Sequence, residues 1–146
     1  MQIVPLVIEE AAYSGFTQKI ILTAADIILL TSGTAASIFP DFNVATQFAA
    51  GTYITDLAIN VKTAFTGQAG TLTMALTDTA ANALSAAGLS LTAAGWLASY
   101  NLTKPILETA VGQILATITS QNAITGWTAG EVHIYLALSD LNTLDR

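Results

Sequence analysis

The chain has a single histidine, His133, and no cysteine, which restricts the catalytic and metal-binding chemistry that it can support. His133 alternates with Glu131 and Tyr135 along an apolar run, so the three side chains share one face of a predicted strand. His133 and Glu131 are too few to close a metal site. A Ser-His-Asp triad would need His133 as its base, and the sequence has no Gly-x-Ser-x-Gly motif. We therefore expect His133 and Tyr135 to be surface or interface residues.

Paired carboxylates are the other acid–base chemistry to consider, since two of them can hydrolyse a glycosidic bond. The adjacent acids Glu9 and Glu10 would point to opposite faces of a strand, and the remaining acids are scattered along the chain. Asp78 and Asn82 resemble part of a calcium loop, but the dense Asp/Asn/Gly spacing of such a loop is missing. We expect the acids to be solvated, and we predict no enzyme, no metal and no cofactor.

Three aromatic residues in loop-like segments could bind a ligand instead: Trp96, Tyr100 and Trp127. Aromatic rings at loop tips can stack on sugars, which makes a carbohydrate-binding or host-recognition module the alternative function. The other interpretation is that these rings cap the ends of a sandwich or fill a subunit interface.

Charged residues are scarce in this chain. They make up 10% of the 146 residues, against roughly 25% in an ordinary soluble domain. Four basic and ten acidic residues give a net charge of −6, which argues against direct binding of nucleic acid. A large, weakly charged surface favours burial against neighbouring subunits.

No membrane segment is expected. Residues 79–103 carry no charge, but their bulky apolar side chains are too sparse for a membrane-spanning helix. The N-terminus lacks the basic residues of a secretory signal.

Residues 51–78 provide the clearest structural pattern. Alternation predicts one apolar face, formed by Tyr53 and every second residue to Phe65, and a second strand with Leu72, Met74 and Leu76 on its apolar face. Gly67 and Gly70 lie between the two strands and can adopt the positive φ of a tight reversal. We therefore predict a β-hairpin that packs on another sheet.

The rest of the chain reads as short strands separated by turns. The last clear strand is predicted at residues 131–138, with Val132, Ile134, Leu136 and Leu138 facing inward. A turn at residues 23–26, a strand at 27–31 and a short helix at 79–87 are also predicted. The fold class is all-β: a jelly-roll-like sandwich of about eight strands with one short helix. Residues 1–146 form one domain, with a possible extended arm at 1–12 and a polar tail at 139–146.

The N-terminal segment, residues 3–8, is apolar and contains Pro5, which predicts an edge strand or an arm that reaches a neighbouring subunit. The interface candidates are the residues of this segment that share one face, together with the loop aromatics and the polar face of the last strand: Ile3, Pro5, Val7, Trp96, Tyr100, Trp127, His133 and Tyr135.

Residues 51–57, 61–67 and 70–78 also carry a family resemblance. Their Val-x-Thr-x-Phe-x-Gly and Thr-Leu-Thr-x-x-Leu-x-Asp motifs resemble those of small β-sandwich virion proteins of tailed bacteriophages. The segments 22–26 and 131–138 fit the same plan, whereas residues 75–77 depart from the Val-Gly that many relatives have there.

The resemblance implies a capsid decoration, or cement, protein or a related head protein, made in the host cytoplasm. The excess of acidic residues would keep it off the packaged DNA, which fits a position on the outer surface of the head. The resemblance further implies a homo-oligomer, most often a trimer, whose partner is the major capsid protein. The family has no catalytic residues to transfer to this chain.

Overall fold

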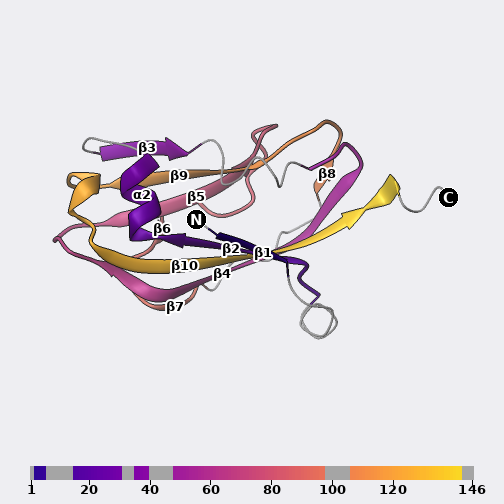
Figure 1. Ribbon diagram of the computed structural model, residues 1–146. Coiled ribbons are helices and arrows are strands. Elements are labelled where there is room, and N and C mark those ends of the chain that lie inside the picture. Colours follow the sequence, from indigo (N-terminus) through magenta and orange to yellow (C-terminus); the bar gives the residue numbers. More distant parts are fainter. Residues whose placement is uncertain (1, 6–14, 31–34, 40–47, 98–105, 143–146) are drawn as a thin grey trace.

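The computed structural model describes residues 2–5, 15–30, 35–39, 48–97 and 106–142. These residues form two antiparallel sheets and one α-helix (Figure 1). Sheet A has six strands in the order β1-β2-β10-β4-β7, with β8 also paired to β4. Its strands are β1 (Gln2–Pro5), β2 (Gln18–Thr23), β4 (Thr52–Thr66), β7 (Gly95–Trp96), β8 (Ile106–Glu108) and β10 (Ala129–Asp140).

Sheet B has four strands in the order β3-β9-β5-β6. They are β3 (Ala35–Phe39), β5 (Leu72–Asp78), β6 (Leu89–Ser90) and β9 (Ile114–Ser120). The order β2-β10-β4-β7 opposite β3-β9-β5-β6 is that of a jelly roll, in which the chain crosses repeatedly between two sheets. The predicted all-β sandwich of about eight strands is confirmed: eight strands have three or more residues, and β6 and β7 have two each.

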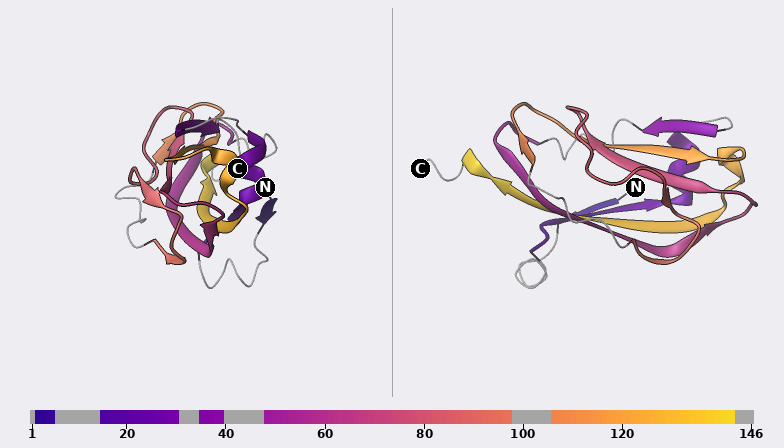
Figure 2. Two further views of the ribbon diagram at one scale, coloured as in Figure 1. Left: turned by 90° about the vertical axis from the view of Figure 1, so that its left-hand side faces the viewer. Right: turned by 180° about the vertical axis from the view of Figure 1, so that it is seen from behind.

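The hydrophobic core lies between the two sheets. Along β5, Leu72, Met74 and Leu76 are buried and their neighbours are partly exposed, as the alternation predicted. Val132 and Ile134 of β10 are fully buried on the opposing sheet. Burying each such side chain stabilises the fold by about 1.5–3 kcal/mol. The long strands β4 and β10 extend along most of the sandwich (Figure 2), and together they contribute more buried apolar residues than any other two strands.

The predicted hairpin is wrong. β4 pairs with β10 in sheet A, whereas β5 pairs with β9 in sheet B. Gly67 and Gly70 do have positive φ, but their turn carries the chain from one sheet to the other. The two apolar faces pack on each other across the core, and alternation alone does not specify which strand edges pair.

The inward face of β4 changes along the strand. Ile54 is buried and Thr55 exposed, the reverse of the predicted faces, whereas Leu57 is buried as predicted. The pairing with β10 shifts here: Ala137 lies opposite Asp56, but Leu138 lies opposite Ile54. An extra residue on one strand reverses the side-chain alternation beyond it, which is the effect of a β-bulge.

The helix lies elsewhere than predicted. Residues 79–87 comprise a turn, a single bridge from Ala83 back to Thr77, and bends, and Ala81 has a positive φ of 64° that no α-helix accommodates. Helix α2 instead spans Ala24–Leu30, where a turn and a strand were predicted, and stands at one end of the sandwich (Figure 1). It starts at a capping box: the backbone N–H and Oγ1 of Thr23 donate to Asp26 Oδ2 at 2.8 and 2.6 Å.

A short 3₁₀ helix, η2 (Ile124–Gly126), precedes β10. Within the described ranges, no helix has the length and apolar character required to cross a membrane.

Both ends of the described chain belong to sheet A. Strand β1 pairs with β2 at the sheet edge, which places Ile3 and Pro5 in an edge strand of their own chain. Val7 and the rest of the predicted arm lie outside the described residues. The first residues of the predicted tail, Ser139 and Asp140, still pair with β4 as part of β10.

Candidate functional site

Two places on the sandwich gather side chains that could serve a function. The first is an aromatic cluster on the outer face of sheet A, formed by Phe16, Trp96, His133 and Tyr135. The Tyr135 ring lies 5.9 Å from that of Phe16, 5.7 Å from that of Trp96 and 6.2 Å from that of His133, measured between centroids. Register brings these residues together, because Tyr135 and His133 alternate on β10 and Trp96 pairs with Asn60 on the neighbouring β4.

Within the aromatic cluster, Trp96 is the exposed member. Its side chain is 63% exposed, whereas His133 is 7% exposed. His133 Nε2 donates to Glu131 Oε1 at 2.5 Å, and its Nδ1 lies 3.4 Å from Tyr135 Oη. The predicted sharing of one face by these three side chains is therefore confirmed, although His133 is more buried than expected.

Trp127 does not belong to this cluster. It is 1% exposed, and its Nε1 donates to Ser120 Oγ at 2.9 Å inside the core. This burial leaves almost none of the ring exposed for stacking on a sugar or for contact with a neighbouring subunit. Tyr100 lies outside the described residues.

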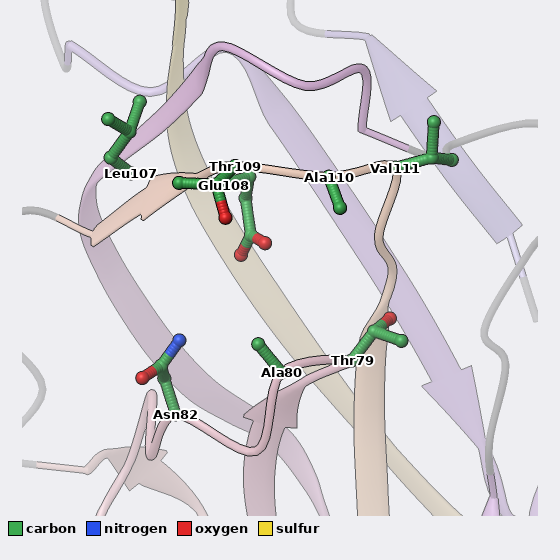
Figure 3. Close-up of a pocket in the computed structure, with 8 residues that line it drawn as sticks. All are labelled: Thr79, Ala80, Asn82, Leu107, Glu108, Thr109, Ala110 and Val111. Carbon is green, nitrogen blue, oxygen red and sulfur yellow. The ribbon is translucent and has the colours of Figure 1, made fainter.

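The second place is a pocket of about 220 Å³ between the end of β5 and the end of β8 (Figure 3). One wall follows β5, and the other comprises β8 and the residues after it. Thr79, Ala80 and Asn82 line the first wall; Leu107, Glu108, Thr109, Ala110 and Val111 line the second.

Two buried carboxyl groups meet beside this pocket. Asp78, the last residue of β5, is 0% exposed, and Glu108, the last residue of β8, is 3% exposed. Burial, and then the hydrogen bond to Asp78 and the negative charge of Asp78, raise the pKa of Glu108 from 4.5 to about 7. In the protonated form Glu108 donates to Asp78, which also accepts from the backbone N–H and Nδ2 of Asn82 at 2.7 Å each. The expectation that both acids are solvated is wrong.

Little in the sequence predicts that these two carboxyl groups lie together. Glu108 is buried because β8 pairs with β4 in a register that sets Glu108 opposite Thr52, far away in the chain. Asp78 carried a partial signal, since it continues the inward parity of Leu72, Met74 and Leu76. A polar residue at an inward position needs a hydrogen-bond partner, so the sequence indicated that Asp78 would have a buried polar neighbour.

Comparisons of the chain with protein-family models, with curated proteins and with solved structures find no match. The chemistry of the two places therefore follows from their own residues. The aromatic cluster offers a ring for stacking, and the carboxyl pair beside the pocket can hold a proton or a cation. In the described part of the chain, no three His, Cys, Asp or Glu side chains form a metal-binding group.

Proposed function

We propose that this chain is a structural protein of a tailed-bacteriophage virion, a capsid decoration protein that binds the outer surface of the assembled head as a homo-oligomer. The observation that most directly supports this proposal is a surface with few charges and several exposed bulky apolar side chains. Leu29 is 84% exposed, Trp96 63%, Val111 61% and Leu107 44%. The chain has fourteen acidic and basic residues for an accessible surface of 7573 Å², and two of them, Asp78 and Glu108, are buried. Exposed apolar side chains on such a surface favour association.

Two of these residues support contact along one side of the sandwich. Trp96 belongs to β7 and Leu107 to β8, and both strands pair with β4 at the margin of sheet A. Strands of two and three residues expose few unpaired backbone groups with which a strand of another chain could pair. Side chains would therefore determine the contacts at this margin of sheet A.

The energetic argument concerns desolvation. Thr, Ala and aliphatic side chains cost little to remove from water, whereas an unpaired buried Lys or Glu costs several kcal/mol. A protein that binds only the assembled shell stabilises it by RT ln(1 + [L]/Kd), and an oligomer gains further from effective concentration. The proposed function needs no catalytic residues.

The fold supports this function without selecting it, because jelly rolls occur in both viral capsid proteins and lectins. The resemblance of residues 51–78 to small phage virion proteins favours the former. The major capsid protein is then the partner, and the net charge of −6 suits an outer position away from packaged DNA.

Size-exclusion chromatography with light scattering tests the first part of the proposal. A homo-oligomer, with a trimer as the leading expectation, should be present at micromolar concentration. Trp96→Ser should shift it toward the monomer, whereas Thr73→Ser, a change to a partly exposed residue of sheet B, should not. A clean wild-type monomer would contradict the proposal.

A second experiment tests the partner. Phage particles lacking the chain should recover resistance to heat or chelation when purified protein is added, and cryo-electron microscopy should locate it on the outer shell. Particles that neither bind the protein nor gain stability would exclude the decoration function.

Carbohydrate binding remains the second candidate because Trp96 is exposed and its ring lies beside that of Tyr135. The chain has two tryptophans, and Trp127 is buried, so a sugar that quenches fluorescence must act through Trp96. Quenching by a member of a glycan panel, lost in Trp96→Phe, would support this function. An unchanged spectrum with every glycan would remove it.

A further inference from the structure

We propose that Asp78 and Glu108 bind a hard divalent cation, Ca²⁺ in the first place, at the pocket between the ends of β5 and β8. This inference is independent of the proposed virion function, because the cation would bind the isolated chain. It rests on the convergence of two carboxyl groups, on an unpartnered buried oxygen and on the chemistry of the pocket wall.

The two carboxyl groups come from different sheets. Asp78 ends β5 of sheet B and Glu108 ends β8 of sheet A, yet the groups lie within hydrogen-bonding reach of each other. The structure gives neither of them a basic partner among the residues that it describes. Two carboxylates held together away from water repel each other unless a proton or a cation lies between them.

One carboxyl oxygen of Glu108 also lacks a hydrogen-bond partner among the described residues. Its Oε1 is buried and has no hydrogen-bond partner within the described ranges, although the residue is only 3% exposed. Figure 3 shows the carboxyl group directed from β8 toward the opposite wall, where Ala80 and Asn82 lie. Buried polar atoms are nearly always satisfied, so an orphaned carboxyl oxygen facing a pocket indicates a ligand.

The remaining ligands would be neutral oxygens. Asn82 Nδ2 donates to Asp78 Oδ2, and Figure 3 shows the amide oxygen of Asn82 turned away from Glu108, so water molecules in the pocket would supply these neutral oxygens. A pocket of about 220 Å³ holds an ion with several of its waters, since a water occupies about 30 Å³ in the liquid.

An all-oxygen set favours Ca²⁺ over Zn²⁺ or other soft metals. Ca²⁺ accepts irregular geometry and retained water, so two carboxylates at a strand end can bind it together with water molecules. With only two charged ligands, the dissociation constant should be about 10⁻⁴–10⁻³ M.

Thermal unfolding in the presence of CaCl₂ tests the proposal. The protein is first freed of metal with EDTA, and ionic strength is held constant with KCl. At ten times the dissociation constant, Ca²⁺ should raise the Tm by about 3–5 °C. MgCl₂ should produce a smaller rise because Mg²⁺ requires near-ideal octahedral geometry, and an equal rise would overturn the assignment to Ca²⁺.

Two variants make the test specific. Glu108→Gln keeps a donor to Asp78 but removes one charged ligand, so its Tm should not respond to CaCl₂. Glu131→Gln is the matched control: it removes the same charge at the opposite end of β4, where Glu131 pairs with Thr63, and should keep the full response. No response in the wild type, or the same response in Glu108→Gln, would overturn the proposal.

A second measurement does not depend on the folding of any variant. Mn²⁺ added to isotope-labelled wild-type protein should broaden the amide resonances of residues 79–82 and 107–111 before those of other residues, and CaCl₂ should reverse the broadening. Broadening spread over the surface, or absent from these two segments, would contradict a site at Asp78 and Glu108.

Discussion

Trp127 and Ser120 form a buried hydrogen bond inside the sandwich. The indole Nε1 donates to Ser120 Oγ at 2.9 Å, and Ser120 Oγ donates in turn to the carbonyl of Asn122 at 2.7 Å. Trp127 is 1% exposed and Ser120 is 0% exposed. The hydroxyl therefore joins the end of β9 to the segment that leads into β10, and fixes the largest side chain of the core.

Replacing this hydroxyl should destabilise the fold. Ser120→Ala leaves the indole N–H buried without an acceptor, and such a group costs about 1–3 kcal/mol. Urea unfolding followed by Trp127 fluorescence would measure the loss. The exposed neighbour on the same strand provides a control, since Thr119→Ala should change stability by less than about 0.5 kcal/mol. Equal midpoints for the two variants would contradict this role of Ser120.

The capping box of helix α2 leads to a second prediction. Asp26→Ala removes the acceptor of both the backbone N–H and the hydroxyl of Thr23, which should cost about 0.5–2 kcal/mol. Asp26→Asn keeps an acceptor oxygen and should lose less. Chemical denaturation of the two variants beside the wild type measures the difference, and an asparagine variant as unstable as the alanine variant would contradict the capping role.

Much of the core could be read from alternation. Leu72, Met74 and Leu76, and likewise Val132 and Ile134, are buried where period-two patterning placed them. Alternation indicates which face of a strand is apolar, because that property depends only on the residues of the strand itself. It does not report which edges pair, so β4 and β5 were joined in a hairpin although they belong to opposite sheets.

The predictions for residues 23–31 and for the faces of β4 were wrong for different reasons. Thr23 and Asp26 have the spacing of a capping box before an apolar run, a signal for α2 that the prediction of a turn and a strand did not use. The bulge near Thr55 depends on the register between β4 and β10, which no local pattern encodes.

The pocket could be predicted only in part, because burial of Glu108 follows from a long-range pairing. Asp78 and Asn82 were considered together only as part of a calcium loop, and the structure joins them by two hydrogen bonds of 2.7 Å. The second carboxyl group was not foreseen, since β8 is a three-residue strand whose side-chain directions are set by β4.

The turn between β4 and β5 leads to a third prediction. A Cβ added at Gly67, where φ is +127°, would overlap the backbone of Gly126 and Thr128. Gly67→Ala should therefore cost about 3 kcal/mol or more, the sum of backbone strain and steric overlap. Gly88 has a φ of +73° and no atom within 4 Å of an added Cβ, so Gly88→Ala should cost only about 1–2 kcal/mol. Thermal unfolding of both variants measures this gap, and equal losses would show that conformational strain alone governs the turn.

Glu108 should make stability depend on pH in an unusual direction. Its pKa is about 7 in the folded protein against 4.5 as the ordinary value, so the folded state binds the proton more tightly than the unfolded state. Below pH 4.5 both states are protonated; as pH rises from 4.5 toward 7, only the unfolded state loses the proton, and stability falls. The total loss should be on the order of 3 kcal/mol, since one pKa unit corresponds to about 1.4 kcal/mol. Urea unfolding with EDTA present should show this decline for the wild type, whereas Glu108→Gln, which cannot ionise, should show a flatter profile. Parallel profiles for the two proteins would mean that Glu108 does not titrate in this range.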